Sequence, residues 1–201
     1  MPLSFLAGRL VTVAVGPDEN RMRWQLHEKL LTLNSLFFED VFNGPEPKDS
    51  IIFPDEDPKI FAKIVRWAYG IAFTTNNGGP PRLFRYQIPD EDEVPVRDYL
   101  SVYVLAGKFQ MTACRNAAID AVYAYFKADL GRRPKMSDLT YIFEHTEPGS
   151  QMRRLMILVS VQYLFSERRV KVDGVMGLPQ DSDWKEALMA SPEMGKLLPF
   201  C

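Results

Sequence analysis

The sequence contains only two cysteines and two histidines, and both scarcities limit the chemistry that it can support. Cys114 and Cys201 are too few for a disulfide framework, and they form no C-x-x-C pair for zinc binding or redox chemistry. His27 and His145 lie in different segments, and neither has a cysteine or aspartate at the spacing of a metal site or catalytic triad. The sequence therefore predicts no metal, no cofactor and an intracellular, reducing compartment, cytoplasmic or nuclear.

An excess of positive charge and a long apolar run are also absent. Lys and Arg number 24 against 26 Asp and Glu, which gives a net charge of −2 and a pI of about 5.8. Duplex nucleic acid and anionic membranes bind clustered basic residues in excess of acids, so neither is an expected partner. The longest apolar run, LMILV at residues 155–159, is far shorter than the roughly 20 residues that span a bilayer.

The motifs of common enzyme classes are missing as well. The sequence has no phosphate loop, no dinucleotide fingerprint, no G-x-S-x-G elbow and no H-E-x-x-H helix. The acidic runs at 54–58 and 89–93 lack the third side-chain oxygen of a calcium loop, because Lys59 and Val94 stand at that position. One enzyme hypothesis stays open at this point, a small hydrolase that pairs His27 with the adjacent glutamate.

The beginning of the chain predicts a hairpin followed by two short helices. Residues 10–15 are rich in β-branched side chains and lead into the turn signal GPDEN, after which residues 22–26 alternate again. Ser35 interrupts the next apolar pattern as the expected N-cap of the second helix. The apolar residues that recur at helical spacing are Leu30, Leu31, Leu33, Leu36, Phe37, Phe38, Val41 and Phe42. From these helices we expect Leu31 and Phe38 to lie in the core.

The remainder of the chain is predominantly helical in pattern. Residues 50–54 predict a short strand, and residues 55–70 predict a helix with Pro58 in its first turn, Phe61 in the core and Gly70 at its end. Four further helices are expected at residues 96–111, 112–128, 137–146 and 150–167, the last two capped by Ser137 and Ser150.

Residues 71–96 predict a long surface insertion that contains one strand-like piece, LFRYQI at 83–88. Two interpretations of this piece remain open. It is either the last strand of the sheet, or an exposed edge through which Phe84 and Tyr86 bind a partner. The candidate interaction residues are Phe73, Leu83, Phe84, Tyr86, Tyr125 and Phe126, of which the last two end an amphipathic helix as core or interface residues.

Four blocks of sequence, in the correct order, resemble a BTB/POZ domain, and specifically the short stand-alone BTB proteins of fungi. The blocks are VTVAVG, WQLHEKLLTLNSLFFEDVF, IIFPDEDPKIFAKIVRWAYG and YLSVYVLAGKFQM. The later stretch YIFEHTEPGSQMRRL is similar to the segment that follows the domain in that group. The residues that match the motifs of the family are His27, Leu31, Ser35, Phe37, Phe38, Trp67 and Tyr69.

The resemblance implies an α+β fold in which a small, mostly three-stranded sheet caps a helical cluster. The domain would cover residues 10–128, preceded by an arm at 1–9 and followed by a helical extension and tail at 129–201. It implies that His27 is architectural and leads from the second strand into the first core helix. His27 would then be half-buried and hydrogen-bonded rather than catalytic.

The resemblance also implies a function without catalysis. The protein would bind other proteins as a scaffold or substrate adaptor, and a cullin-type ubiquitin ligase is among the partners implied. A transcription-associated regulator that acts through protein contacts is the alternative. A homodimer would form without exchange of an N-terminal strand, because only MPLSFLAGR precedes the first strand.

Overall fold

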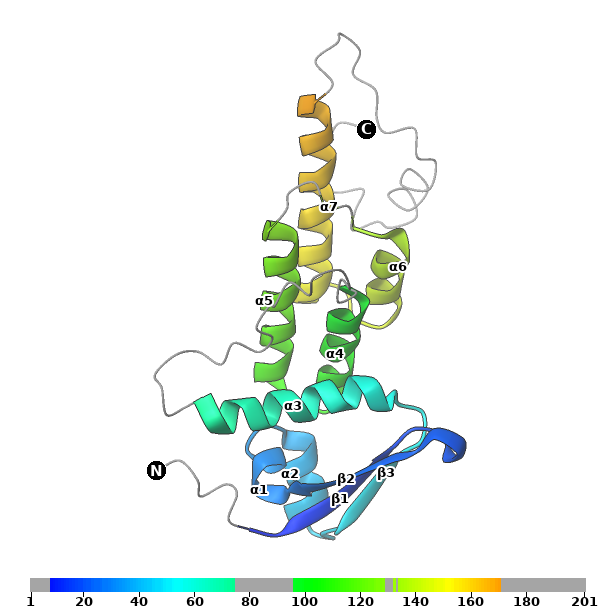
Figure 1. Cartoon of the computed structure of the whole chain (residues 1–201), viewed down its shortest axis with the longest axis vertical. Coiled ribbons are helices and arrows are strands. Elements are labelled where there is room, and N and C mark those ends of the chain that lie inside the picture. The colour runs from blue at the N-terminus through cyan, green and yellow to red at the C-terminus, as the bar shows by residue number, and fades with distance from the viewer. Residues whose placement is uncertain (1–7, 75–95, 129–131, 133, 171–201) are drawn as a thin grey trace. The chain divides into compact units, whose positions relative to one another are not determined.

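The computed structural model describes residues 8–74, 96–128, 132 and 134–170, without the side chains of 71–74 and 164–170. These residues form an α+β fold with a three-stranded mixed sheet and seven α-helices, so the predicted class is confirmed (Figure 1). The chain divides into two compact units, Met1–Ala121 and Val122–Cys201. The division falls inside a helix, earlier than the boundary expected after residue 128.

The sheet of the first unit has the strand order β2-β1-β3 (Figure 1). Strand β1 (Leu10–Val15) pairs antiparallel with β2 (Met22–His27) and parallel with β3 (Ser50–Phe53). Gly16 starts the hairpin turn with a φ of +102°, a conformation that glycine adopts without steric cost. The predicted hairpin and third strand are therefore confirmed.

Two short helices, α1 (Glu28–Thr32) and α2 (Leu36–Asn43), follow the hairpin. Ser35 caps α2, because its Oγ accepts a hydrogen bond from the backbone N–H of Phe38 at 3.0 Å. The same Oγ donates to the carbonyl oxygen of Phe109 at 2.5 Å, across 74 residues of sequence. The predicted N-cap is confirmed, and it also fixes α2 against a distant part of the unit.

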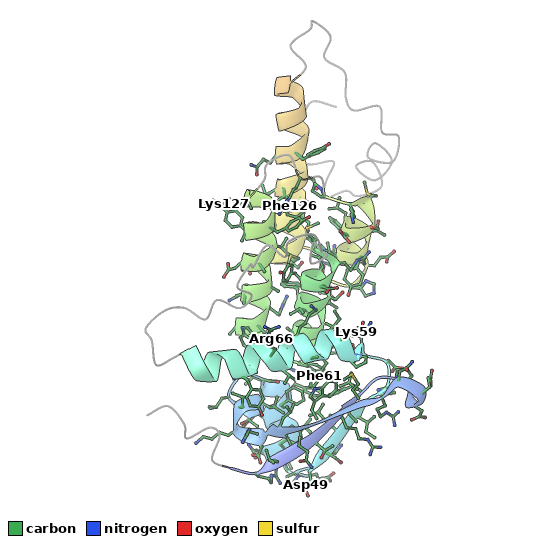
Figure 2. All side chains as sticks on the ribbon, viewed as in Figure 1. Asp49, Lys59, Phe61, Arg66, Phe126 and Lys127 are labelled. Carbon is green, nitrogen blue, oxygen red and sulfur yellow. The ribbon has the colours of Figure 1, made fainter. Side chains whose placement is uncertain are left out.

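Aromatic rings fill the core of the first unit. Phe38 stacks with Phe42 at a centroid distance of 5.8 Å and meets Phe109 at 5.1 Å. Phe61 points from α3 (Pro58–Thr74) toward the sheet and meets the ring of Trp24 on β2 at 5.0 Å (Figure 2). Leu31, Phe38 and Phe61 are all buried, as the sequence predicts.

Helix α3 runs to Thr74, so the prediction that it ends at Gly70 is wrong. Glycine in a helix interior costs about 1 kcal/mol relative to alanine, and packing over the rest of the helix outweighs that cost. The φ of Gly70 is not positive, and a Cβ added at this position would meet no atom within 4 Å.

Gly70→Ala is therefore expected to stabilise the protein by about 0.5–1 kcal/mol, because alanine loses less chain entropy in a helix than glycine. Urea unfolding measures this difference. Gly16→Ala is the opposite control: its φ is positive, and its Cβ would lie 3.2 Å from the carbonyl oxygen of Asn20. A loss of stability in Gly70→Ala would contradict the helical role of this residue.

Two helices that the sequence predicts complete the first unit. Helix α4 (Val96–Lys108) and the beginning of α5 (Thr112–Ala128) are separated by a turn at 109–111, close to the predicted break. Lys63 on α3 pairs with Asp98 on α4 at 3.2 Å. Helices α3 and α4 therefore lie side by side in this unit.

The second unit contains the end of α5 together with α6 (Met136–Glu144) and α7 (Gln151–Val170). Ser150 caps α7 as predicted, since its Oγ lies 3.3 Å from the backbone nitrogen of Arg153. The cap predicted at Ser137 is wrong. The backbone is extended at Lys135, with a ψ of 138°, so α6 starts one residue before Ser137.

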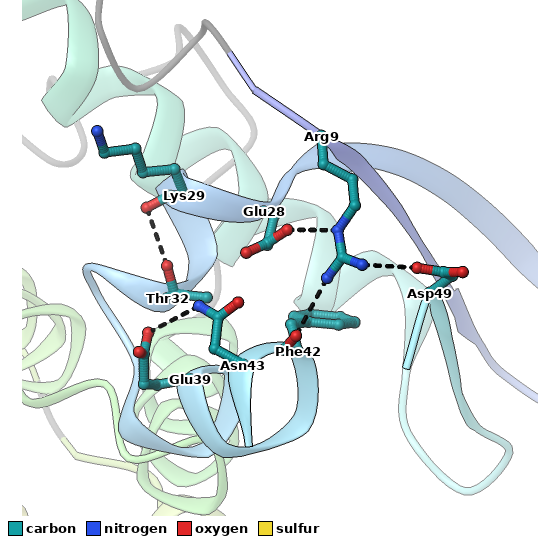
Figure 3. A network of polar contacts seen from close by, with 8 residues as sticks. All are labelled: Arg9, Glu28, Lys29, Thr32, Glu39, Phe42, Asn43 and Asp49. Carbon is teal, nitrogen blue, oxygen red and sulfur yellow. Dashed lines mark hydrogen bonds and ion pairs between the residues drawn. The ribbon is translucent and has the colours of Figure 1, made fainter. Parts of the chain in front are cut away.

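Arg9 ties together four segments of the first unit (Figure 3). Its guanidinium donates to Glu28 Oε2 at 2.5 Å, to Asp49 Oδ1 at 2.7 Å and to the carbonyl oxygen of Phe42 at 3.1 Å. These partners belong to the start of α1, the approach to β3 and the end of α2. Arg9, which the sequence analysis places in the N-terminal arm, therefore binds residues of the first unit on three later segments.

Candidate interaction surface

The half-buried His27 ends β2, and its partner is a tyrosine 42 residues away. The His27 Nδ1 atom lies 2.9 Å from Tyr69 Oη on α3, and the backbone N–H of His27 donates to the same Oη at 3.3 Å. The Tyr69 hydroxyl therefore contacts both the backbone and the ring of His27. His27 and Tyr69 thus join the sheet to α3.

Tyr69→Phe is expected to cost about 1–3 kcal/mol in unfolding free energy, because it leaves a backbone donor and Nδ1 of His27 without their partner. Chemical denaturation measures the loss. Tyr123→Phe is the matched control, since Tyr123 is 51% exposed on α5. Equal stability of the two variants would show that the His27–Tyr69 bond does not hold the fold.

Glu28, the other residue of the hydrolase hypothesis, interacts with residues other than His27. Its carboxylate holds Arg9, and Asn43 approaches its second oxygen. In one orientation of the Asn43 amide, its nitrogen lies 3.4 Å from Glu39 Oε2 and its oxygen faces only acceptors (Figure 3). Reversing the amide places its nitrogen 2.7 Å from Glu28 Oε1. Within the described residues, no hydrogen bond joins His27 to Glu28.

The motif that follows the predicted domain forms a network between α6 and α7 in the second unit. The Arg153 guanidinium donates to the Thr146 hydroxyl at 2.9 Å, to the Phe143 carbonyl oxygen at 2.7 Å and to the Thr146 carbonyl oxygen. The Ser150 hydroxyl in turn lies 3.3 Å from the Thr146 hydroxyl. Arg153 therefore binds the Phe143 carbonyl in the last turn of α6 and the Thr146 carbonyl just after it, and these motif residues have a structural role.

The described cysteine and the metal-ligating residues give no reactive centre. Burial raises the pKa of the Cys114 thiol to about 12, so it is a protonated core side chain at neutral pH. In the described part of the chain, no group of three or more His, Cys, Asp and Glu side chains could hold a metal ion. No described helix is long and apolar enough to cross a membrane.

Among the predicted interaction residues, only Tyr125 and Phe126 have side chains that the structure describes. Leu83, Phe84 and Tyr86 lie outside the described residues, as does the strand expected there, and the side chain of Phe73 is also outside them. Tyr125 and Phe126 near the end of α5 are buried, with their rings 5.1 Å apart. In this structure the last two are core residues and do not form an exposed patch.

Two residues of the family-like motif also belong to the core. Trp67 on α3 is buried. Phe37, half-buried on α2, contacts the rings of Phe53 and Phe109 at 5.9 and 5.7 Å.

Two of the apolar residues that recur at helical spacing lie on the surface. Leu33 is 62% exposed and Leu36 is 67% exposed, and they are the two most exposed large apolar side chains described in the first unit. Leu33 follows α1 and Leu36 begins α2, three residues further along the chain. Exposed apolar patches are typical of contact sites for other molecules.

The turn that carries these leucines is rigidly held. The backbone N–H groups of Leu33 and Asn34 donate to carbonyl oxygens of α1, and the Asn34 side chain donates to the Leu30 carbonyl oxygen at 2.8 Å. Ser35 is fixed by its bonds to α2 and to Phe109. Binding here would cost little ordering of the backbone, because the turn is already ordered.

Two carboxylates continue the same exposed face along α2. Glu39 and Asp40 are exposed and lie one helical turn beyond Leu36. Among the described residues neither carboxylate makes an ion pair, and the preferred Asn43 orientation removes the one side-chain hydrogen bond to Glu39. We call Leu33, Leu36, Glu39 and Asp40 the leucine surface.

The sequence matches no protein-family model and no curated protein.

Proposed function

We propose that this protein is a non-enzymatic protein-interaction module of the BTB/POZ type, which acts as a scaffold or as a substrate adaptor inside the cell. The leucine surface is its candidate contact site. A cullin-type ubiquitin ligase and a second copy of the chain are the partners that the family resemblance implies.

The arrangement of elements supports this proposal. The order β1, β2, α1, α2, β3 and α3 follows the order of the first three family-like blocks, and the fourth block falls in α4 and the turn after it. The sequence expected His27 to lead from the second strand into the first core helix, and it lies at that junction. Histidine, glutamate and tyrosine side chains that could have served catalysis join elements of the fold.

The exposure of Leu33 and Leu36 is the observation that carries the proposal. A leucine side chain contributes about 1.5–3 kcal/mol when it is buried, and both of these remain mostly in water. They sit on a rigid turn above a closed aromatic core, so they contribute little to folding. Their position is explained by a partner that covers them.

Replacement of both Leu33 and Leu36 by serine should weaken partner binding on the order of a hundredfold and leave the unfolding transition in place. Affinity purification from the native cells with quantitative mass spectrometry identifies the partners, and titration with each purified partner measures the change. Leu158→Ser is the matched control, because Leu158 is 62% exposed on α7 in the other unit. Partners that are retained equally by all three proteins would refute the leucine surface as the contact site.

The same purification tests the adaptor role. A cullin recovered with the wild-type protein supports recruitment to a ubiquitin ligase. If cullins are absent while other partners depend on the leucines, the protein is a scaffold. Hydrolysis of a substrate panel that is lost in a folded His27→Ala variant would refute the non-enzymatic function altogether.

A further inference from the structure

The charge beside the exposed leucines indicates the kind of partner that they take. We infer that the leucine surface binds a basic amphipathic helix of another protein. This inference rests on the proposed function and extends it from protein binding in general to one class of ligand.

The sign of the charge follows from the side chains of the two short helices. Glu39 and Asp40 are exposed and make no ion pair among the described residues, whereas Glu28 is neutralised by Arg9. Lys29 on α1 is exposed and positively charged. The exposed, unpaired charges of the two short helices are therefore one positive and two negative, which gives a net negative charge. A partner with arginine or lysine at this face therefore gains attraction, and an acidic partner is repelled.

The backbone of the surface favours a helix over an extended strand. A strand binds by main-chain hydrogen bonds to a free edge, but the N–H groups of Leu33, Asn34 and Ser35 already donate within the turn. A helix satisfies its own backbone and contacts the surface through side chains alone.

The spacing on α2 sets the pattern of the partner. Glu39 and Asp40 follow Leu36 by three and four residues, which is one helical turn of about 5.4 Å. The partner helix should present apolar residues at i and i+3 or i+4 over the two leucines. Arginine or lysine should follow about one turn further along the same face.

Selection from a random peptide library tests this pattern without a known partner. Phage that display random peptides of about 14 residues, or four helical turns, are selected on the full chain. Counter-selection on Leu33→Ser/Leu36→Ser then retains peptides that need the leucines. These peptides should be basic and amphipathic, and their affinity should fall about tenfold or more in Glu39→Lys/Asp40→Lys.

The matched control is Glu19→Lys/Asp55→Lys, which makes the same change in net charge at exposed residues outside α1 and α2. This control should bind the selected peptides like the wild-type chain, apart from a small long-range effect that salt screens. Thermal unfolding of each variant verifies that it is folded.

The outcomes separate this inference from the proposed function. Leucine-dependent peptides that are acidic or uncharged, or that bind equally to both charge variants, overturn the basic-helix inference and leave protein binding in place. Peptides that never depend on the leucines overturn the leucine surface, and with it the inference. Basic, helical, leucine-dependent peptides with the charge preference described above support both.

Discussion

Phe38→Ala is expected to lower the unfolding free energy by about 3–5 kcal/mol, a large share of the net stability of a domain. The Phe38 ring is fully buried. It lies within 6.3 Å, centroid to centroid, of the rings of Phe37, Phe42, Phe53 and Phe109. Removal of the ring leaves a cavity among residues from α2, β3 and the turn after α4, which cannot all move inward to fill it. Urea unfolding followed by circular dichroism measures the loss.

Leu36→Ala is the control on the same helix. It also removes a large apolar side chain from α2, but that side chain is mostly exposed, so the change should stay within about 0.5 kcal/mol. A loss below about 1 kcal/mol for Phe38→Ala would show that the register of α2 is wrong. A large loss for Leu36→Ala would place this leucine in the core.

The second large effect is expected in the second unit. Arg153→Ala should cost about 2–4 kcal/mol, because carbonyl oxygens of Phe143 and Thr146 lose a charged donor in a buried position. The guanidinium also lies 4.9 Å from the centre of the Phe143 ring, and this cation–π contact is lost as well. Thermal and chemical unfolding measure the change, and proteolysis of α6 and α7 reports where the structure opens.

The adjacent Arg154 provides the control. Arg153 is 7% exposed, whereas Arg154 is exposed on the other side of α7, so Arg154→Ala should change stability by less than about 0.5 kcal/mol. Arg153→Lys keeps the charge but not the planar fork of donors, and it should recover only part of the loss. Full recovery by lysine would mean that charge alone matters at this position.

Local signals predicted much of the secondary structure. The β-branched runs on both sides of a Gly-Pro turn predicted the hairpin, and Ser35 and Ser150 predicted two helix starts. These features depend on neighbours within a few residues, which the sequence displays directly. The predictions at Gly70 and Ser137 were wrong, although both rested on local signals. Helix α3 continues through Gly70 to Thr74, and the extended backbone at Lys135 decides where α6 starts.

The surface could not be predicted from the apolar pattern. Leu33 and Leu36 fit the helical spacing of the residues around them, most of which are buried. The predicted break at Ser35 is confirmed, since α1 ends at Thr32 and α2 begins at Leu36, but the break alone does not show which side chains lie on the surface. The pair Asn34–Ser35 inside the pattern is the signal for the break, but their tertiary partners decide its geometry.

The partner of His27 could not be predicted from the local sequence pattern either. Tyr69 is 42 residues away and on another helix, so only the folded chain brings the two side chains together. The sequence predicted an architectural histidine and could not name the residue that holds it.

The bond between Ser35 and Phe109 has a consequence for synthesis of the protein. The ribosome releases the chain from its N-terminus, so the hairpin, α1 and α2 emerge before Phe109 exists. At about 5–20 residues per second, the 74 residues between the two partners take about 4–15 seconds to translate. During that interval the chain does not yet contain Phe109, whose ring packs against those of Phe38 and Phe53. We therefore expect the nascent chain to expose apolar rings until Phe109 has left the ribosome, and fragments that stop before Phe109 to aggregate.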